Sequence, residues 1–170
     1  MNERKNAVTL RGTPLTLIGP ELKTGERAPE FTALDNAMQP VRLADSAGKV
    51  RLIASVGSLD TPICDAETRR FNQEAASIPG VEFLIVSMDL PFAQKRFCSS
   101  ADIEKVRLLS DHRDAAFGAA YGTLIKETRL LSRGIFVVDA EGVLRYVEYV
   151  PEIGAHPDYD KALAAVRAAG

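Results

Sequence analysis

The sequence is poor in the residue types that mark several classes of protein. It contains no tryptophan, two cysteines and two histidines, and 6% of its residues are aromatic. Two cysteines are too few for a secreted scaffold held together by several disulfides. A structural zinc site is also disfavoured, because the cysteines and histidines show neither C-x-x-C nor H-x-x-x-H spacing.

Charge and hydropathy exclude further classes. Lysine and arginine number 21 against 23 acidic residues, a net charge of −2. No strong charge therefore favours nucleic acid or an anionic membrane. No apolar run reaches the roughly 18–20 residues of a transmembrane helix. The opening residues, MNERKNAVTLRG, lack the apolar region of a secretory signal. We expect a cytoplasmic protein that binds neither nucleic acid nor membrane.

What is present is an ordinary globular composition. Hydrophobic residues make up 46% of the 170 residues and charged residues 26%. A chain of this length forms one domain on a scale of roughly 100–200 residues per domain. We therefore expect a single domain over residues 1–170, with a core that needs no disulfide or metal.

The hydrophobic pattern predicts alternating strands and helices. An N-terminal β-hairpin spans residues 8–18, and a late hairpin turns at residues 140–142. This order predicts an α/β fold, a mixed central sheet flanked by helices, compatible with a thioredoxin-like domain. The other predicted strands are residues 31–34, 41–43, 50–56, 81–89, 106–109, 135–139 and 143–150, and the predicted helices are 62–78, 92–98, 114–121 and 157–168.

Cys64 falls in the first turn of one predicted helix. Thr61 is a candidate N-cap and Pro62 suits the first helical position. The free N–H groups of a helix start favour a thiolate, but Asp65 opposes it. A dipole effect of roughly 0.3–1 kcal/mol is too small by itself, so a reactive thiolate needs a nearby cation. Without such a partner, Cys64 and Cys98 are interpreted as buried apolar thiols.

Two cysteine segments resemble a known family. Residues 57–64, GSLDTPIC, resemble the peroxiredoxin signature P-x-x-x-T-x-x-C, and residues 91–98, PFAQKRFC, resemble the resolving-cysteine segment of the bacterial thiol peroxidases. The flanking segments VTLRGTPLTL, GERAPEFTALD, AGKVRLI, TRRFN and SRGIFVVD agree as well. The resemblance covers residues 8 to 165 and implies a thioredoxin-like fold.

The resemblance implies a role for four residues. Cys64 matches the peroxidatic cysteine, whose thiolate attacks a hydroperoxide and becomes a sulfenic acid. Thr61 matches the threonine that contacts the thiolate and orients the peroxide. Arg133 matches the active-site arginine and supplies the missing cation, although a surface ion pair is the commoner fate of an arginine. Cys98 matches the resolving cysteine, which forms an intramolecular disulfide with Cys64.

The family resemblance also implies the wider reaction. The substrates are hydrogen peroxide and alkyl hydroperoxides, thioredoxin reduces the disulfide, and the protein is a homodimer. No metal, haem, flavin or selenium is required. Cys64 and Cys98 lie on different predicted helices, so we expect the reduced and disulfide forms to differ mainly at residues 58–66 and 91–100.

Gly57 departs from the family pattern, which has proline at this position. Glycine lacks the ring and adds backbone freedom, so the pocket over Cys64 should be looser. We expect the chemistry to survive with a lower rate or with easier over-oxidation. Two alternatives stay open: a general thiol–disulfide oxidoreductase, which the missing C-x-x-C disfavours, and a non-catalytic or weakened redox sensor on the same fold.

Overall fold

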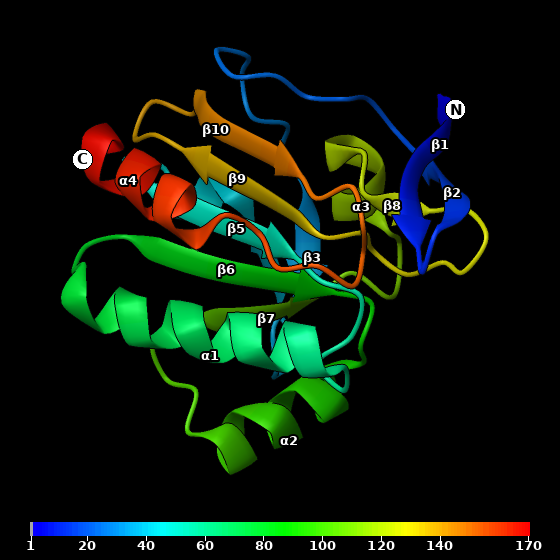
Figure 1. Ribbon diagram of the computed structural model, residues 1–170. Coiled ribbons are helices and arrows are strands. Elements are labelled where there is room, and N and C mark those ends of the chain that lie inside the picture. Colours follow the sequence, from blue (N-terminus) through cyan, green and yellow to red (C-terminus); the bar gives the residue numbers. More distant parts are fainter. Residues whose placement is uncertain (1) are drawn as a thin grey trace.

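The computed structural model describes residues 2–170 and contains one large sheet, one small sheet and four α-helices (Figure 1). The helices are α1 (Pro62–Ser77), α2 (Pro91–Ala101), α3 (Ala116–Tyr121) and α4 (Tyr159–Ala169), with a 3-10 helix at Leu43–Ser46. The strands are β1 (Glu3–Leu10), β2 (Thr13–Ile18), β3 (Thr32–Leu34), β4 (Pro40–Arg42), β5 (Arg51–Ser55), β6 (Glu82–Ser87), β7 (Arg107–Ser110), β8 (Leu124–Ile125), β9 (Gly134–Val138) and β10 (Leu144–Tyr149).

The large sheet is mixed, with the strand order β10-β9-β5-β6-β7-β3-β4. Strands β5, β6 and β7 are parallel, whereas β9 runs antiparallel to β5 and β10 antiparallel to β9. The loop after β5 leads into α1, and the loop after β6 leads into α2. Both cysteine-bearing helices therefore begin at the same edge of the sheet, the carboxyl ends of neighbouring parallel strands.

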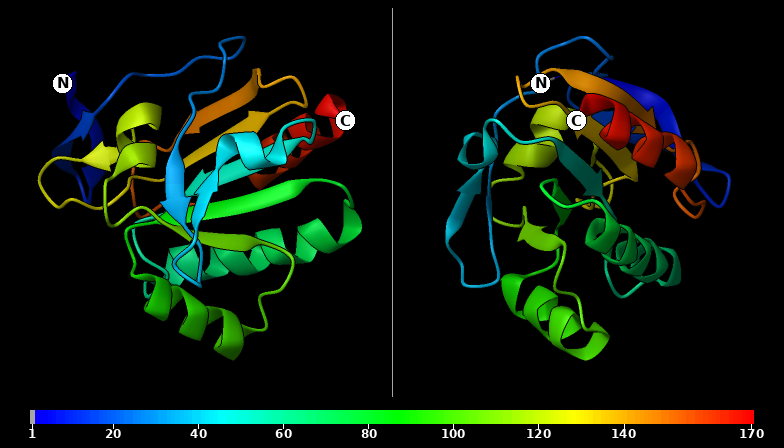
Figure 2. Two further views of the ribbon diagram at one scale, coloured as in Figure 1. Left: turned by 180° about the vertical axis from the view of Figure 1, so that it is seen from behind. Right: turned by 90° about the vertical axis from the view of Figure 1, so that its left-hand side faces the viewer.

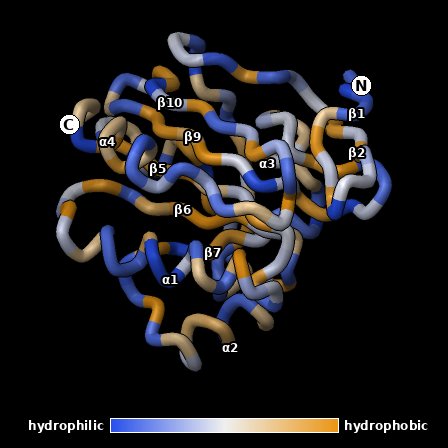
Figure 3. The backbone as a smooth tube through the Cα atoms, viewed as in Figure 1, coloured by the Kyte–Doolittle hydropathy of each residue, from blue (hydrophilic) through white to orange (hydrophobic). Residues whose placement is uncertain are grey.

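The two faces of the sheet are covered by different elements. Helices α1 and α4 lie on one face, and α3 lies on the other (Figure 2). Strand β5 contributes alternately to both, because successive side chains point to opposite faces. Leu52 and Ala54 join the apolar cluster under α1 and α4, and Ile53 joins the cluster on the opposite face. Hydrophobic residues accordingly concentrate along the central strands (Figure 3).

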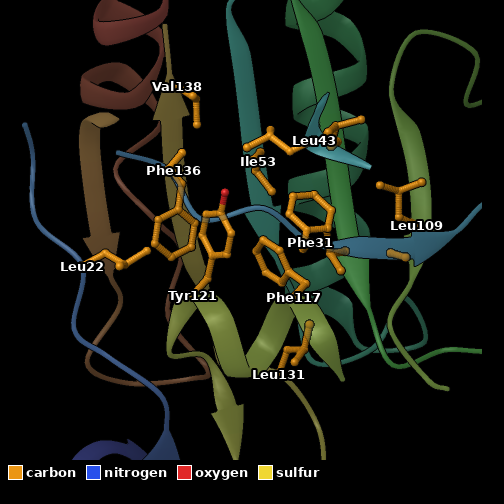
Figure 4. Close-up of a cluster of buried hydrophobic side chains, with 14 of the residues drawn as sticks. Leu22, Phe31, Leu43, Ile53, Leu109, Phe117, Tyr121, Leu131, Phe136 and Val138 are labelled. Atoms are coloured by element: carbon orange, nitrogen blue, oxygen red, sulfur yellow. The ribbon is translucent and has the colours of Figure 1, made fainter. Parts of the chain in front are cut away.

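An aromatic cluster fills the second face (Figure 4). The rings of Phe117 and Tyr121 are stacked with centroids 4.4 Å apart, and Phe31 and Phe136 meet Tyr121 edge-on at 5.7 and 5.0 Å. Edge-to-face and offset-stacked pairs are the favoured arrangements of aromatic rings. The Tyr121 hydroxyl donates to the Pro29 carbonyl, which satisfies the only polar atom that its side chain buries.

The small sheet contains the predicted N-terminal hairpin. Strands β1 and β2 pair around Arg11 and Gly12, whose φ values of 49° and 82° fit a two-residue hairpin turn. Strand β8 adds to the free edge of β2 and was not predicted. Two residues are too few for a hydrophobic period, so no pattern in the sequence indicates β8.

The other predicted elements are confirmed with shifted bounds. Helix α2 begins one residue earlier and ends three residues later than predicted, at Pro91 and Ala101, because Asp102 in the left-handed conformation ends it. Helix α3 begins at Ala116 rather than Asp114, since Ala115 also has positive φ. Gly122 ends α3 as predicted. The mixed sheet flanked by helices confirms the predicted fold class.

Candidate active site

Cys64 lies in the first turn of α1, as the sequence predicted, and its side chain is almost completely buried. Its sulfur is 3.4 Å from the Nη2 atom of Arg133, which reaches it from the segment before β9. The cation that a thiolate at this position needs is therefore in direct contact with the sulfur. The structure brings together two predicted residues that lie 69 positions apart in the chain.

Arg133 is held by three partners inside the protein. Its side chain is 2% exposed, its Nη1 atom is 3.0 Å from Glu67 Oε1, and Nε and Nη2 both donate to the Ile153 carbonyl. Burial lowers the pKa of Arg133, but the Glu67 carboxylate and the Cys64 sulfur outweigh burial, and the pKa is raised above its usual value. The guanidinium is thus a fixed, fully charged group beside the thiol.

Glu67 is a site residue that the sequence analysis missed. It lies three residues after Cys64 on the same face of α1, and its side chain has no solvent exposure. Burial raises the pKa of Glu67 to about 7, although Arg133 pulls it in the opposite direction. The signal that could have found it is the i, i+3 spacing of a carboxylate from the cysteine. That spacing has no meaning until Arg133 is known to reach both residues.

Thr61 occupies the N-cap position of α1 with an extended backbone, as predicted. Its side chain does not cap the helix, however. The hydroxyl donates instead to the Ser58 carbonyl at 2.8 Å, within the loop that precedes α1. Because that bond fixes the hydroxyl proton, the lone pairs of Oγ1 are left to accept a hydrogen bond from a ligand.

Cys98 lies in the last turns of α2, in surroundings different from those of Cys64. Its sulfur accepts a hydrogen bond from Asn36 Nδ2 at 3.6 Å, from the turn between β3 and β4. Burial raises the pKa of Cys98, and the Asn36 bond lowers it by less. The thiol is therefore more fully protonated than a free cysteine at neutral pH. Both cysteines are free, and within residues 2–170 they share no hydrogen-bond partner.

Gly57 begins the loop between β5 and α1. A Cβ atom built at this position has the Leu131 carbonyl oxygen, 3.7 Å away, as its nearest neighbour. Its φ lies outside the left-handed region, so the backbone does not require glycine here. A small side chain at this position would therefore meet only an ordinary van der Waals contact.

No helix among residues 2–170 combines the length and the apolar character that crossing a membrane requires. In the same described range, no group of three or more histidine, cysteine, aspartate or glutamate side chains is arranged to hold a metal ion.

Comparison with known proteins places the chain in a family. The redoxin family model matches residues 23–163. The thiol peroxidase of Halalkalibacterium halodurans is 56% identical over 96% of this chain and 98% of its own length, and the thiol peroxidase of Bacillus subtilis is 50% identical over 95% and 96%. A peroxiredoxin-like protein from Aquifex aeolicus is 43% identical, with a TM-score of 0.91 over 97% of this chain and 98% of its own.

The chain belongs to the redoxin family. Its relatives place it among the bacterial thiol peroxidases, which are oxidoreductases of the peroxiredoxin type. A thiol peroxidase from Chromobacterium violaceum, 23% identical with a TM-score of 0.85, shares the fold. The predicted family and the predicted thioredoxin-like fold are both confirmed.

Proposed function

We propose that this protein reduces hydrogen peroxide and alkyl hydroperoxides through a Cys64–Cys98 disulfide cycle. The observation that carries the proposal is the contact between Arg133 and the buried Cys64 sulfur at the start of α1. A cation and the free N–H groups of a helix start both stabilise a thiolate, and a thiolate is the nucleophile that the reaction requires.

In the first step the Cys64 thiolate attacks the terminal oxygen of the hydroperoxide. The O–O bond breaks, an S–O bond forms, and the leaving alkoxide takes up a proton as an alcohol, or as water for hydrogen peroxide. The fixed guanidinium of Arg133 stabilises the thiolate and the charge that develops on the leaving oxygen. The free lone pairs of Thr61 orient the O–H of the hydroperoxide. The product on the enzyme is a Cys64 sulfenic acid.

In the second step Cys98 attacks the sulfenic sulfur, forming a disulfide and releasing water. In the structure described above, which we call closed because α2 is packed in place, Asn36 donates a hydrogen bond to Cys98, and burial raises the pKa of Cys98. Opening of α2 would relieve that burial and return the pKa toward its usual value, which increases the thiolate fraction. Thiol–disulfide exchange with thioredoxin then restores both thiols. The resemblance further supports a homodimer and a cytoplasmic enzyme that requires no cofactor.

The experiment that tests this cycle is intact mass and a free-thiol count after one equivalent of an organic hydroperoxide reacts with the reduced protein. We expect both thiols to disappear and the mass of the monomeric chain to fall by two hydrogens. Cys98→Ser should stop at an added oxygen on Cys64, and Cys64→Ser should not react. An unchanged parent protein would contradict the proposal and favour the alternative of a non-catalytic member of the fold.

A further inference from the structure

A chain of polar contacts joins the loop before α1 to the end of β6. Asp89, which follows β6, accepts hydrogen bonds from Ser58 Oγ at 2.8 Å and from the Leu59 backbone N–H at 2.9 Å. Its Oδ2 atom also accepts from Ser87 Oγ at 2.8 Å. Thr61 donates to the carbonyl of Ser58, so the bonds of Asp89 hold the loop that carries the N-cap of the Cys64 helix.

The same chain continues into α2. Gln94 is fully buried in the first turn of that helix, and its Nε2 atom donates to Ser87 Oγ at 3.1 Å and to the Leu109 carbonyl at 2.9 Å. A carboxylate can only accept and an amide nitrogen can only donate, so Ser87 gives its proton to Asp89 and accepts from Gln94. One buried hydroxyl therefore links the two segments that carry the cysteines.

The side chain that attaches α2 to this chain of contacts has one polar atom without a hydrogen-bond partner. Gln94 Oε1 is buried and has no hydrogen-bond partner. A buried unpaired acceptor destabilises the closed state, and water would satisfy it when α2 opens. Opening of α2 would also admit water to Ser87 and Asp89, where it would compete with the bonds to Ser58 and Leu59.

We propose that Asp89, Ser87 and Gln94 are positioning residues that couple opening of the loop at residues 57–61 to opening of α2. The two cysteine segments would then leave the closed structure together, which is what formation of a Cys64–Cys98 disulfide requires. The catalytic meaning of this coupling rests on the proposed disulfide cycle. The coupling itself is a property of the reduced protein and does not depend on peroxide.

The test is Gln94→Met, which keeps the side-chain size but removes both hydrogen bonds of Nε2 together with the unpaired Oε1 acceptor. Amide hydrogen exchange of the reduced protein is measured by mass spectrometry over residues 57–66 and 91–101. We expect exchange to rise in both segments by roughly five- to tenfold, the free energy of about one buried hydrogen bond, because loss of the unpaired acceptor offsets part of the two lost bonds. A rise confined to residues 91–101 would overturn the proposal, because Gln94 would then stabilise only its own helix.

Asp89→Asn provides the reciprocal variant. It weakens the contacts of the loop, and we expect faster exchange in α2, to which the Asp89 carboxylate makes no direct hydrogen bond among the described residues. The matched control is Ser99→Ala, also on α2, whose exposed hydroxyl bonds only to the Lys95 carbonyl. The control should leave exchange at residues 57–66 unchanged. An Asp89→Asn protein whose α2 exchanges at the parent rate would count against the coupling even if Gln94→Met does not fold.

Single-turnover kinetics separate the two proposals. Disulfide formation after hydroperoxide should be faster in Gln94→Met by the same factor as loop exchange, while the rate of Cys64 oxidation changes less than twofold. A parent protein that never forms a disulfide refutes the proposed cycle. The amide hydrogen exchange measurements would then still test whether the two segments open together. Faster loop exchange with an unchanged rate of disulfide formation would refute the catalytic role of the coupling.

Discussion

At the scale of single residues, the site depends on a buried ion pair that the reaction itself does not consume. Arg133 contacts both Glu67 and Cys64, and the side chains of the pair are 2% and 0% exposed. Removing one partner of such a pair leaves an uncompensated buried charge, which costs about 3–5 kcal/mol. Loss of Glu67 or of Arg133 therefore affects the stability of the fold as well as the chemistry.

The raised pKa of Glu67 makes this pair sensitive to pH. The pKa of Glu67 in the folded state is about 7, above the ordinary value of 4.5. Protonation of Glu67 therefore stabilises the folded state relative to the unfolded state. The stabilisation is complete below pH 4.5 and is lost as the pH rises through 7.

Glu67→Gln should remove this dependence on pH. Urea unfolding of the parent and the variant is measured from pH 5 to 8, and the parent should lose stability relative to the variant as the pH rises. Because all other titrating groups are shared, only the difference between the two curves is interpreted. Parallel curves would show that Glu67 stays ionised throughout this range.

At the scale of elements, the loop between β5 and α1 sets access to Cys64. Gly57→Pro introduces the family residue at a position where an added Cβ atom meets no close contact and the backbone is not left-handed. Removing glycine freedom stabilises the loop by roughly 0.4–1 kcal/mol, or about two- to fivefold in population. We expect faster oxidation of Cys64, less sulfinic acid, or both, measured by stopped-flow kinetics and intact mass.

Gly57→Ala is the matched control for the proline ring. Its Cβ atom meets nothing closer than the Leu131 carbonyl oxygen at 3.7 Å, so it limits the backbone without adding a ring. Equal behaviour of the alanine and proline variants would assign the effect to backbone freedom. If neither differs from the parent, the ring is dispensable in this protein.

At the scale of the whole molecule, the two thiols of the structure are free and are bound by different side chains. Cys64 contacts Arg133, which precedes β9. Cys98 contacts Asn36, which lies in the turn between β3 and β4 at the opposite end of the strand order from β9. A disulfide needs Cα atoms about 4.4–6.8 Å apart. These separate partners support the prediction that residues 58–66 and 91–100 rearrange when the disulfide forms.

Crystal structures of the reduced and disulfide forms, superposed on β5, β6 and β9, test this prediction. We expect the sheet and α4 to superpose closely, because the apolar clusters on both faces stay packed. The displacement should be confined to the loop before α1, the first turn of α1, and α2. Superposition of these segments without movement would contradict local unfolding as a step of the cycle.

The sequence by itself determined the order of strands and helices, the position of Cys64 at a helix start and the family, because periodicity, caps and motifs are local signals. It could not reveal the short strand β8, the Arg133–Glu67 pair, the Asn36–Cys98 contact or the Asp89–Ser87–Gln94 chain. Among these, the pairing of β8 with β2 joins Leu17 to Ile125, and the Arg133–Glu67 pair joins residues 66 positions apart. Only the tertiary structure decided them, because the ordering of strands in the sheet determines which distant side chains meet.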